Sequence, residues 1–485
     1  MANRPDLTLD PQNWETLRHL GHRMVDDMLD LLQNIRREPV WRPLPEEHYE
    51  RLDEDLPFRP QDPGAVYDEF KTHILPYPTG NIHPRFWGWV MGSGTPVGAL
   101  AEMLAAAMNA NVCMGEHAAM QVELQVLKWC KQLLDYPDTS SGLLTSGASM
   151  ANFTALVVAL HHESGGYSRS HGLQQKSKPM VLYCSAESHG CIQRAAETMG
   201  IGAASLRKIP VDHQYRIRTD LLEQTIQTDL AGGFFPFCIV GNAGTVNTGA
   251  IDPLGELLVL SRKYDLWFHI DGAFGALAKK TPEYEDDLRA IEQADSVAFD
   301  LHKWMYMPYE VGCVLVRNAE AHRKAFEQAP HYLLRHERGL SAGEHNFGNY
   351  GVELSRGFKA LKVWMSMKTH GVFAYLVLIR QNIAQARYLA SRVQQHPDLE
   401  LLAPAGLNIV CFRYSRPGRT EEELRTVNRE ILMQLQEEGT AIVSATLLQG
   451  RYALRAAICN HRTRMEDIDV LVEAVTRLGA GFFPC

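Results

Sequence analysis

The feature that most constrains the fold is an alternation of short apolar runs with helical patterns between residues 180 and 316. The runs are rich in β-branched and other apolar side chains and lie at 180–184, 237–240, 266–270, 296–299 and 313–316. A strand followed by a helix and another strand returns the chain to the same end of a sheet, so such strands run mostly parallel. The pattern therefore predicts an α/β fold around a largely parallel sheet.

The regions on either side of this alternation have different patterns. Residues 11–37 carry apolar side chains at helical spacing, and the proline-rich, charged stretch 39–63 has little that could build a core. After about residue 375 the sequence pattern predicts a long helix, followed by the strands and helices of a smaller α+β unit. We therefore predict an N-terminal helical extension at 1–85 that packs on the main domain or a second subunit, a large domain at 86–375 and a small domain at 376–485.

Composition argues against several classes of protein. The chain of 485 residues has a formal net charge of -9, which disfavours nucleic acid as a partner because phosphate binding needs a clustered positive surface. The most apolar stretch, 99–114, is too short and too polar to span a bilayer, and the N-terminus has no apolar signal core. The nine scattered cysteines form no CxxC pair, which favours free thiols in the cytoplasm over disulfides or a metal site.

Two chemically unusual residues follow neighbouring predicted strands. Asp271 ends the run 266–270, and Lys303 comes shortly after the run 296–299. Ligands of open α/β sheets bind beyond the carboxyl ends of the strands. Taken alone, Asp271 could cap a helix, and most lysines are surface groups. In a binding site, the acid could pair with a protonated ring nitrogen, and a partly desolvated, neutral lysine could form an imine.

Three more segments end at the same predicted edge. His189 follows the run 180–184 and could be an interior histidine or stack on a flat ring. The small residues of 145–152 open a helix whose free N–H groups could bind an anion, and Gly244 and Thr245 form a small polar loop. Pyridoxal 5′-phosphate (PLP) requires an amine for its aldehyde, an acid for its ring nitrogen, a flat side chain against its ring and an anion site for its phosphate. The set predicts a PLP site.

These residues also resemble a known family, the group II PLP-dependent amino-acid decarboxylases, and in particular its aromatic-L-amino-acid branch. The resemblance covers nearly the whole length. It rests on 83–86, the loop 145–152, His189 with Arg194 and Ala195, Gly244 with Thr245, 269–271, 302–304 and 355–362. The lysine motif with Asp271 upstream is its most specific part.

The resemblance implies the fold type I PLP architecture, with a mostly parallel seven-stranded sheet, a small C-terminal domain and an active site at a homodimer interface. It implies a carboxy-lyase that converts an L-amino acid, with an aromatic one as the leading expectation, to its amine and CO₂; the composition above predicts that it is soluble and cytoplasmic. The implied catalytic residues are Lys303, Asp271, His189 and Tyr332. The implied cofactor contacts are Lys303, Asp271, Ala273, His189, Gly147, Ala148, Ser149, Thr245, Asp300 and His302, and the implied substrate contacts are Trp89, Gly92 and Arg356.

Three positions depart from the animal aromatic enzymes, and three further functions stay open. Asp300 stands where those enzymes have asparagine, which places an acid near the phosphate; Val246 and Gly92 each stand where they have threonine. A decarboxylase of glutamate, aspartate or cysteine sulfinate would need a cation such as Arg85 for the side-chain carboxylate. The second open function is oxidative deamination to an aldehyde, and the third is PLP binding without catalysis. Retention of His189 and Tyr332 favours plain decarboxylation.

Overall fold

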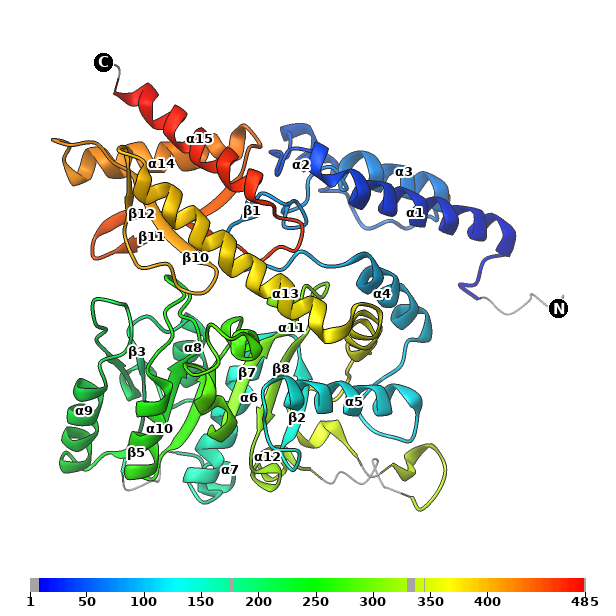
Figure 1. The fold of residues 1–485 in the computed structure, drawn as a ribbon. Helices are drawn as coiled ribbons and strands as arrows, with labels where there is room; N and C mark the ends of the chain where they lie inside the picture. Colours follow the sequence, from blue (N-terminus) through cyan, green and yellow to red (C-terminus); the bar gives the residue numbers. More distant parts are fainter. Residues whose placement is uncertain (1–7, 174–177, 329–335, 344, 484–485) are drawn as a thin grey trace.

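The computed structural model describes residues 8–173, 178–328, 336–343 and 345–483. Its larger unit is built on a seven-stranded sheet in the order β2-β8-β7-β6-β5-β3-β4 (Figure 1). The strands of this sheet are β2 (Ser141–Thr145), β3 (Met180–Ser185), β4 (Leu206–Ile209), β5 (Phe235–Asn242), β6 (Trp267–Asp271), β7 (Ser296–Asp300) and β8 (Gly312–Val316).

Neighbouring strands from β4 to β7 pair in parallel, and β8 runs antiparallel to both β7 and β2. The prediction of a mostly parallel, seven-stranded α/β sheet is confirmed, and every predicted strand of this unit is present. β2 and β4 were not predicted. β4 is a short edge strand with two basic residues, and β2 begins Ser-Gly, so neither shows the apolar run of a buried strand.

Helices complete the larger unit and bury its apolar core. α6 packs against β5, β6, β7 and β8, and most of its apolar side chains are buried there. The helices of this unit are α4 (Pro96–Met108), α5 (Ala118–Leu133), α6 (Ala148–Glu163), α7 (Tyr167–His171), α8 (Gly190–Thr198), α9 (Thr219–Ala231), α10 (Leu254–Lys263), α11 (Leu301–Trp304) and α12 (Ala319–Phe326).

The smaller unit has a second sheet, in the order β1-β11-β12-β10-β9. Its strands are β1 (Phe86–Trp87), β9 (Leu399–Leu401), β10 (Ile409–Tyr414), β11 (Ile442–Leu448) and β12 (Arg451–Ala457), and its helices are α14 (Glu421–Glu437) and α15 (Met465–Phe482). Its core is separate from that of the larger unit and includes Trp87.

The observed elements differ from the predicted domain boundaries at both ends of the large domain. β1 lies just after the boundary at 85/86 but pairs in parallel with β11 of the smaller sheet. The boundary at 375/376 falls inside α13 (Ala360–Gln395), which contacts both units and is interrupted at Gly371, where φ is +71°. A strand of two residues shows too little alternation of side chains to indicate which sheet it joins. Its partner strand is also some 350 residues away in the chain, so no local signal connects the two.

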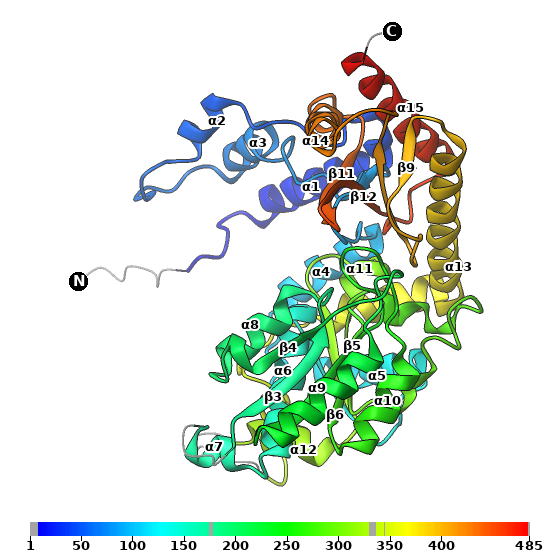
Figure 2. The same cartoon turned by 90° about the vertical axis from the view of Figure 1, so that its left-hand side faces the viewer.

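The N-terminal helices α1 (Trp14–Asn34), α2 (Glu46–Arg51) and α3 (Pro63–His73) project from the rest of the chain (Figure 2). α1 has no buried residue, and Trp14 is 62% exposed. None of the helices in the described ranges is long and apolar enough to cross a membrane.

A buried ion pair joins α5 to the segment before α13. The Arg356 guanidinium pairs with the Glu123 carboxylate and also donates to the carbonyl oxygens of Val112, at 2.7 Å, and Leu144, at 2.8 Å. Arg356 and Glu123 are 4% and 0% exposed. Burying two charges is favourable only when each is compensated, so the pair depends on both partners.

Replacing Arg356 by leucine should therefore destabilise the protein, because Glu123 would remain buried without its counter-charge. We expect the free energy of unfolding to fall by about 3–5 kcal/mol. Urea titration followed by circular dichroism measures this change. Arg380→Leu, which breaks the more exposed pair with Glu283, is the control and should cost less than about 1 kcal/mol. Equal losses in the two variants would contradict the assignment.

Candidate active site

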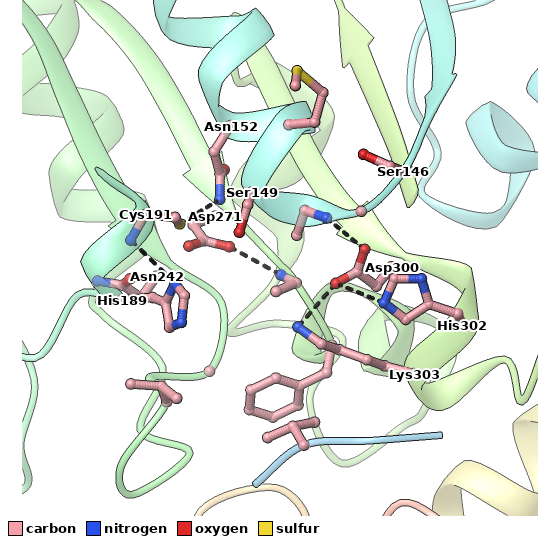
Figure 3. Close-up of a pocket in the computed structure, with 18 of the residues that line it drawn as sticks. Ser146, Ser149, Asn152, His189, Cys191, Asn242, Asp271, Asp300, His302 and Lys303 are labelled. Carbon is pink, nitrogen blue, oxygen red and sulfur yellow. Dashed lines mark hydrogen bonds and ion pairs between the residues drawn. The ribbon is translucent and has the colours of Figure 1, made fainter. Parts of the chain in front are cut away.

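A cavity of about 360 Å³ lies beyond the carboxyl ends of β5, β6 and β7, next to the start of α6 (Figure 3). This is the sheet edge at which the sequence predicts a ligand site, and the volume is within the range of small-molecule pockets. The lining residues are Val90, Ser146, Gly147, Ala148, Ser149, Met150, Asn152, His189, Cys191, Asn242, Gly244, Val246, Asp271, Ala273, Phe274, Asp300, His302, Lys303 and Tyr309.

Lys303 lies in the short helix α11, directly after β7, and its side chain is 21% exposed. Its Nζ is 2.9 Å from Oδ2 of Asp300. Burial disfavours the ammonium form, but the adjacent Asp300 carboxylate and the charge of Asp271 outweigh this and raise the pKa of Lys303. The sequence argument required a neutral amine for imine formation, whereas here the amine is held as an ion pair because Asp300 is adjacent.

Asp271 is the last residue of β6 and is buried. Its Oδ1 accepts a hydrogen bond of 3.1 Å from the backbone N–H of Ala273. Burial raises the pKa of Asp271 above its ordinary value, against the opposing charge of Lys303. A carboxyl in this setting gains from a nearby proton donor or cation, and a protonated pyridine nitrogen is both.

A chain of polar groups orients Asn152 beside Asp271. The ring of His269 bonds Ser296 Oγ at 2.8 Å through Nδ1 and Asn152 Oδ1 at 2.8 Å through Nε2. Because the amide oxygen of Asn152 is engaged by His269, its NH₂ group faces the cavity side, where it contacts Cys191 Sγ at 3.3 Å. The sequence motif contained Asn152 and His269 but gave no sign that they would meet, since 117 residues separate them.

The start of α6, where the sequence predicts an anion site, lies on the cavity. Ser146, Gly147, Ala148 and Ser149 all line the cavity, and α6 begins at Ala148. A side chain at Gly147 would place its Cβ 3.2 Å from Cε1 of His302, so glycine allows His302 to approach. One amide of this site is already engaged, because the backbone N–H of Ala148 donates to Asp300 Oδ1 at 2.6 Å.

Two histidines lie on opposite sides of the cavity. Nδ1 of His189 accepts from the backbone N–H of Cys191 at 3.2 Å, which caps α8 and leaves Nε2 to carry the proton of the neutral ring. His302 accepts from the N–H of Val311 and lies 4.4 Å, centroid to centroid, from the ring of Tyr309. Burial lowers the pKa of His302 despite the nearby Asp300 charge, which favours a neutral ring.

Four of the residues assigned from the sequence do not line the cavity. Thr245 is buried and bonds Thr248 through its hydroxyl, while its neighbours Gly244 and Val246 face the cavity. Trp89 is 57% exposed, and Arg356 is engaged in the interior by Glu123. Gly92 lies behind the Lys303 segment, where an added Cβ would be 2.1 Å from the carbonyl oxygen of His302. Their contacts with a ligand stay predictions, and Tyr332 lies outside the described residues.

Several lining residues were not predicted. Asn242 ends β5, and its side chain bonds Ser188 Oγ at 2.9 Å and the buried Asp252 at 2.7 Å. Its position after a parallel strand was a usable signal, since the neighbouring strands also end in site residues. Phe274 and Tyr309 had no comparable signal, because aromatic residues near a core are most often packing residues.

The residues present fit PLP on three structural grounds. The carboxyl of Asp271 is buried and faces the cavity from the strand end. The start of α6 presents small residues and backbone N–H groups to the same space, as a phosphate requires. The Lys303 amine reaches the cavity between them. No group of three or more His, Cys, Asp or Glu side chains in the described ranges is arranged to hold a metal ion.

Comparisons with known proteins agree with a PLP site. The family model of the pyridoxal-dependent decarboxylase conserved domain matches residues 45–415. An aromatic-L-amino-acid decarboxylase of Bacillus atrophaeus is 34% identical over 479 residues, which cover 97% of this chain and 98% of that protein. A phenylacetaldehyde synthase of Arabidopsis thaliana is 29% identical over 469 residues, 94% of each chain.

Among solved structures, Oryza sativa TDC with PLP and tryptamine superposes with a TM-score of 0.89. The sequence identity is 25%, and the match covers 98% of this chain and 100% of that one. The likeness extends over both structural units and includes the PLP fold type I arrangement that the sequence predicted. The chain therefore belongs to the pyridoxal-dependent decarboxylase family and is a PLP-dependent amino-acid decarboxylase.

Proposed function

We propose that this enzyme decarboxylates aromatic L-amino acids to the corresponding amines and CO₂. The observation that carries the proposal is the placement of Lys303 and Asp271 at the ends of the paired strands β7 and β6, on one cavity. The similarity to an aromatic-L-amino-acid decarboxylase at 34% identity supports the aromatic class.

The chemistry of the cavity also favours an aromatic side chain over an acidic one. Val90, Val246, Phe274 and Tyr309 supply apolar and aromatic surface. Of the described lining residues, Lys303 carries the positive charge, and it is paired with Asp300. Arg85, the candidate for binding a side-chain carboxylate, donates instead to the carbonyl oxygen of Thr440 at 2.7 Å.

We assign roles to four residues. Bound PLP supplies an electron sink for the substrate bond that breaks. Asp271 would hold the proton on the ring nitrogen, Lys303 would hold the cofactor through Nζ, and His189, which lines the same cavity, would contact the ring. Tyr332, which the family resemblance assigns, would supply a proton at Cα of the substrate.

We further propose a homodimer in the cytoplasm. α1 exposes Trp14 and Leu17, and α4 exposes Met103, Leu104 and Met108, so both helices present apolar surface that a second subunit would cover. Eight cysteines in the described ranges are buried free thiols, which is typical of a reducing compartment.

Lys303→Ala should abolish both CO₂ release and the visible absorbance of bound cofactor, because the attachment point is lost. Absorbance spectra of the purified protein and a CO₂ assay with L-tryptophan measure the two effects. Lys324→Ala is the matched control and should change neither, because the Lys324 side chain on α12 is 59% exposed and does not line the cavity. Normal decarboxylation by Lys303→Ala would refute this role.

Asp271→Asn keeps the size of the side chain but removes the negative charge that stabilises the ring proton. A nearby opposite charge shifts a pKa by about 1–3 units, so CO₂ release should fall by about 10- to 1000-fold. The visible absorbance should remain, since Lys303 is intact. Steady-state kinetics with spectra of the same preparation separate the two effects; an unchanged rate would remove Asp271 from this role.

A panel of amino acids tests the substrate class and the reaction outcome together. We expect L-tryptophan, L-tyrosine or L-phenylalanine to release CO₂ and amine in equal amounts, and L-glutamate and L-aspartate to release little. The 29% identity to a phenylacetaldehyde synthase makes aldehyde formation the second candidate. Aldehyde with peroxide in place of amine would favour that candidate, and activity confined to acidic substrates would refute the aromatic class.

A further inference from the structure

Asp300 is an acid that lies beside the start of α6, where the sequence predicts binding of an anionic group of the ligand. It ends β7, is 2% exposed, and its carboxylate contacts three groups, one of which is Nε2 of His302, 3.6 Å from Oδ2. Oδ1 accepts from the backbone N–H of Ala148 at 2.6 Å, and Oδ2 lies 2.9 Å from Nζ of Lys303 (Figure 3). One carboxylate thus connects the start of α6 to the lysine.

The position of this carboxylate is set by close packing. A Cβ added to Gly312 would lie 2.8 Å from Asp300 Oδ1 and 2.6 Å from the Cα of Gly147, so the glycines bring the three backbones together. The backbone N–H of Asp300 donates to the carbonyl oxygen of Ala273 at 2.9 Å. Asp300 therefore has little freedom to turn away from Lys303.

Other titratable groups face Lys303 from the surrounding elements. Asp271 approaches from β6, His302 is its neighbour in α11, and Cys459 follows β12. Burial lowers the pKa of His302 and raises that of the Cys459 thiol, which favours the neutral form of each. Cys191 and Tyr309 line the same cavity, and burial raises the pKa of both, so they too are neutral at pH 7. Asp300 is the acid in direct contact with the amine.

We propose that Asp300 is a positioning residue that binds the Lys303 ammonium whenever Lys303 is not joined to the cofactor. The ion pair holds the amine in its charged form at the β7 side of the cavity. The proton must leave Nζ for solvent before this amine can attack a carbonyl, so Asp300 makes cofactor uptake depend on pH. The proposal rests on the proposed function only in taking Lys303 as the cofactor-binding lysine.

A purely structural role for Asp300 makes a different prediction. If its purpose were to cap α6 through the N–H of Ala148, asparagine would serve equally well, since its amide oxygen also accepts a hydrogen bond. Asparagine cannot stabilise an ammonium group by charge. Asp300→Asn therefore separates the two roles.

The test is trace acetylation of the cofactor-free, full-length enzyme across pH 7–11.5 (about one unit beyond the usual lysine pKa), with mass spectrometry of the Lys303 peptide. In the wild type, the midpoint for Lys303 should lie above that of the exposed Lys178 in the same digest. In Asp300→Asn, it should fall by about one unit or more, which raises labelling at pH 8 about tenfold or more. Glu310→Gln, a nearby acid that pairs with Lys359, should leave the midpoint unchanged.

Two results would overturn the proposal: a wild-type Lys303 midpoint below that of Lys178, or the same midpoint in Asp300→Asn as in the wild type. Asp300→Ser provides a second variant if Asp300→Asn fails to fold. The comparison of Lys303 with Lys178 in the wild type tests the proposal without any variant. The measurement uses neither cofactor nor substrate. Failure of decarboxylation by the loaded wild type would therefore count against the proposed function alone.

Discussion

The parallel pairing of β6 with β7 is the constraint on which the site depends. Asp271 pairs in register with Ala298. Two further backbone hydrogen bonds follow: the N–H of Gly272 donates to the carbonyl oxygen of Ala298, and the N–H of Asp300 donates to that of Ala273. These bonds set the separation between the acid at the end of β6 and the lysine that follows β7. A cofactor that needs an acid on one side and an amine on the other can be held only if that separation is set by the backbone.

Glycines let the other elements approach this pair of strands. Gly147 allows α6 to start against His302, Gly312 allows β8 to pass beside Gly147 and Asp300, and Gly92 lies against the carbonyl oxygens of His302 and Lys303. An added Cβ would lie 2.1 Å from a backbone atom at Gly92 and 2.6 Å at Gly312, which leaves no room for a side chain, whereas at Gly147 the nearest atom, Cε1 of His302, would be 3.2 Å away. Backbone is therefore packed on backbone directly behind His302, Lys303 and Asp300, and close packing of this kind helps to hold the reactive groups in place.

Charge in the cavity is arranged so that one amine faces two acids. Asp271 and Asp300 both raise the pKa of Lys303, although burial alone would lower it. The amine that must become neutral to bind the cofactor is thus stabilised in its charged form. A protonated ring nitrogen beside Asp271 would offset this cost, because Asp271 would then gain a partner of its own.

The sequence by itself determined the α/β class, the strand-end positions of Asp271 and Lys303, the place of the start of α6 beside them, and the family. The first three follow from local periodicity and from residues that lie next to strand ends, and the family follows from the resemblance of short motifs to a known family; none of these depends on distant contacts. Tertiary structure decided the rest, because it depends on pairings across long stretches of chain. Such pairings join β1 to the small domain, Asn152 to His269, Arg356 to Glu123 and Asp300 to Ala148. Nothing in the local sequence around these residues specifies which distant group they will meet.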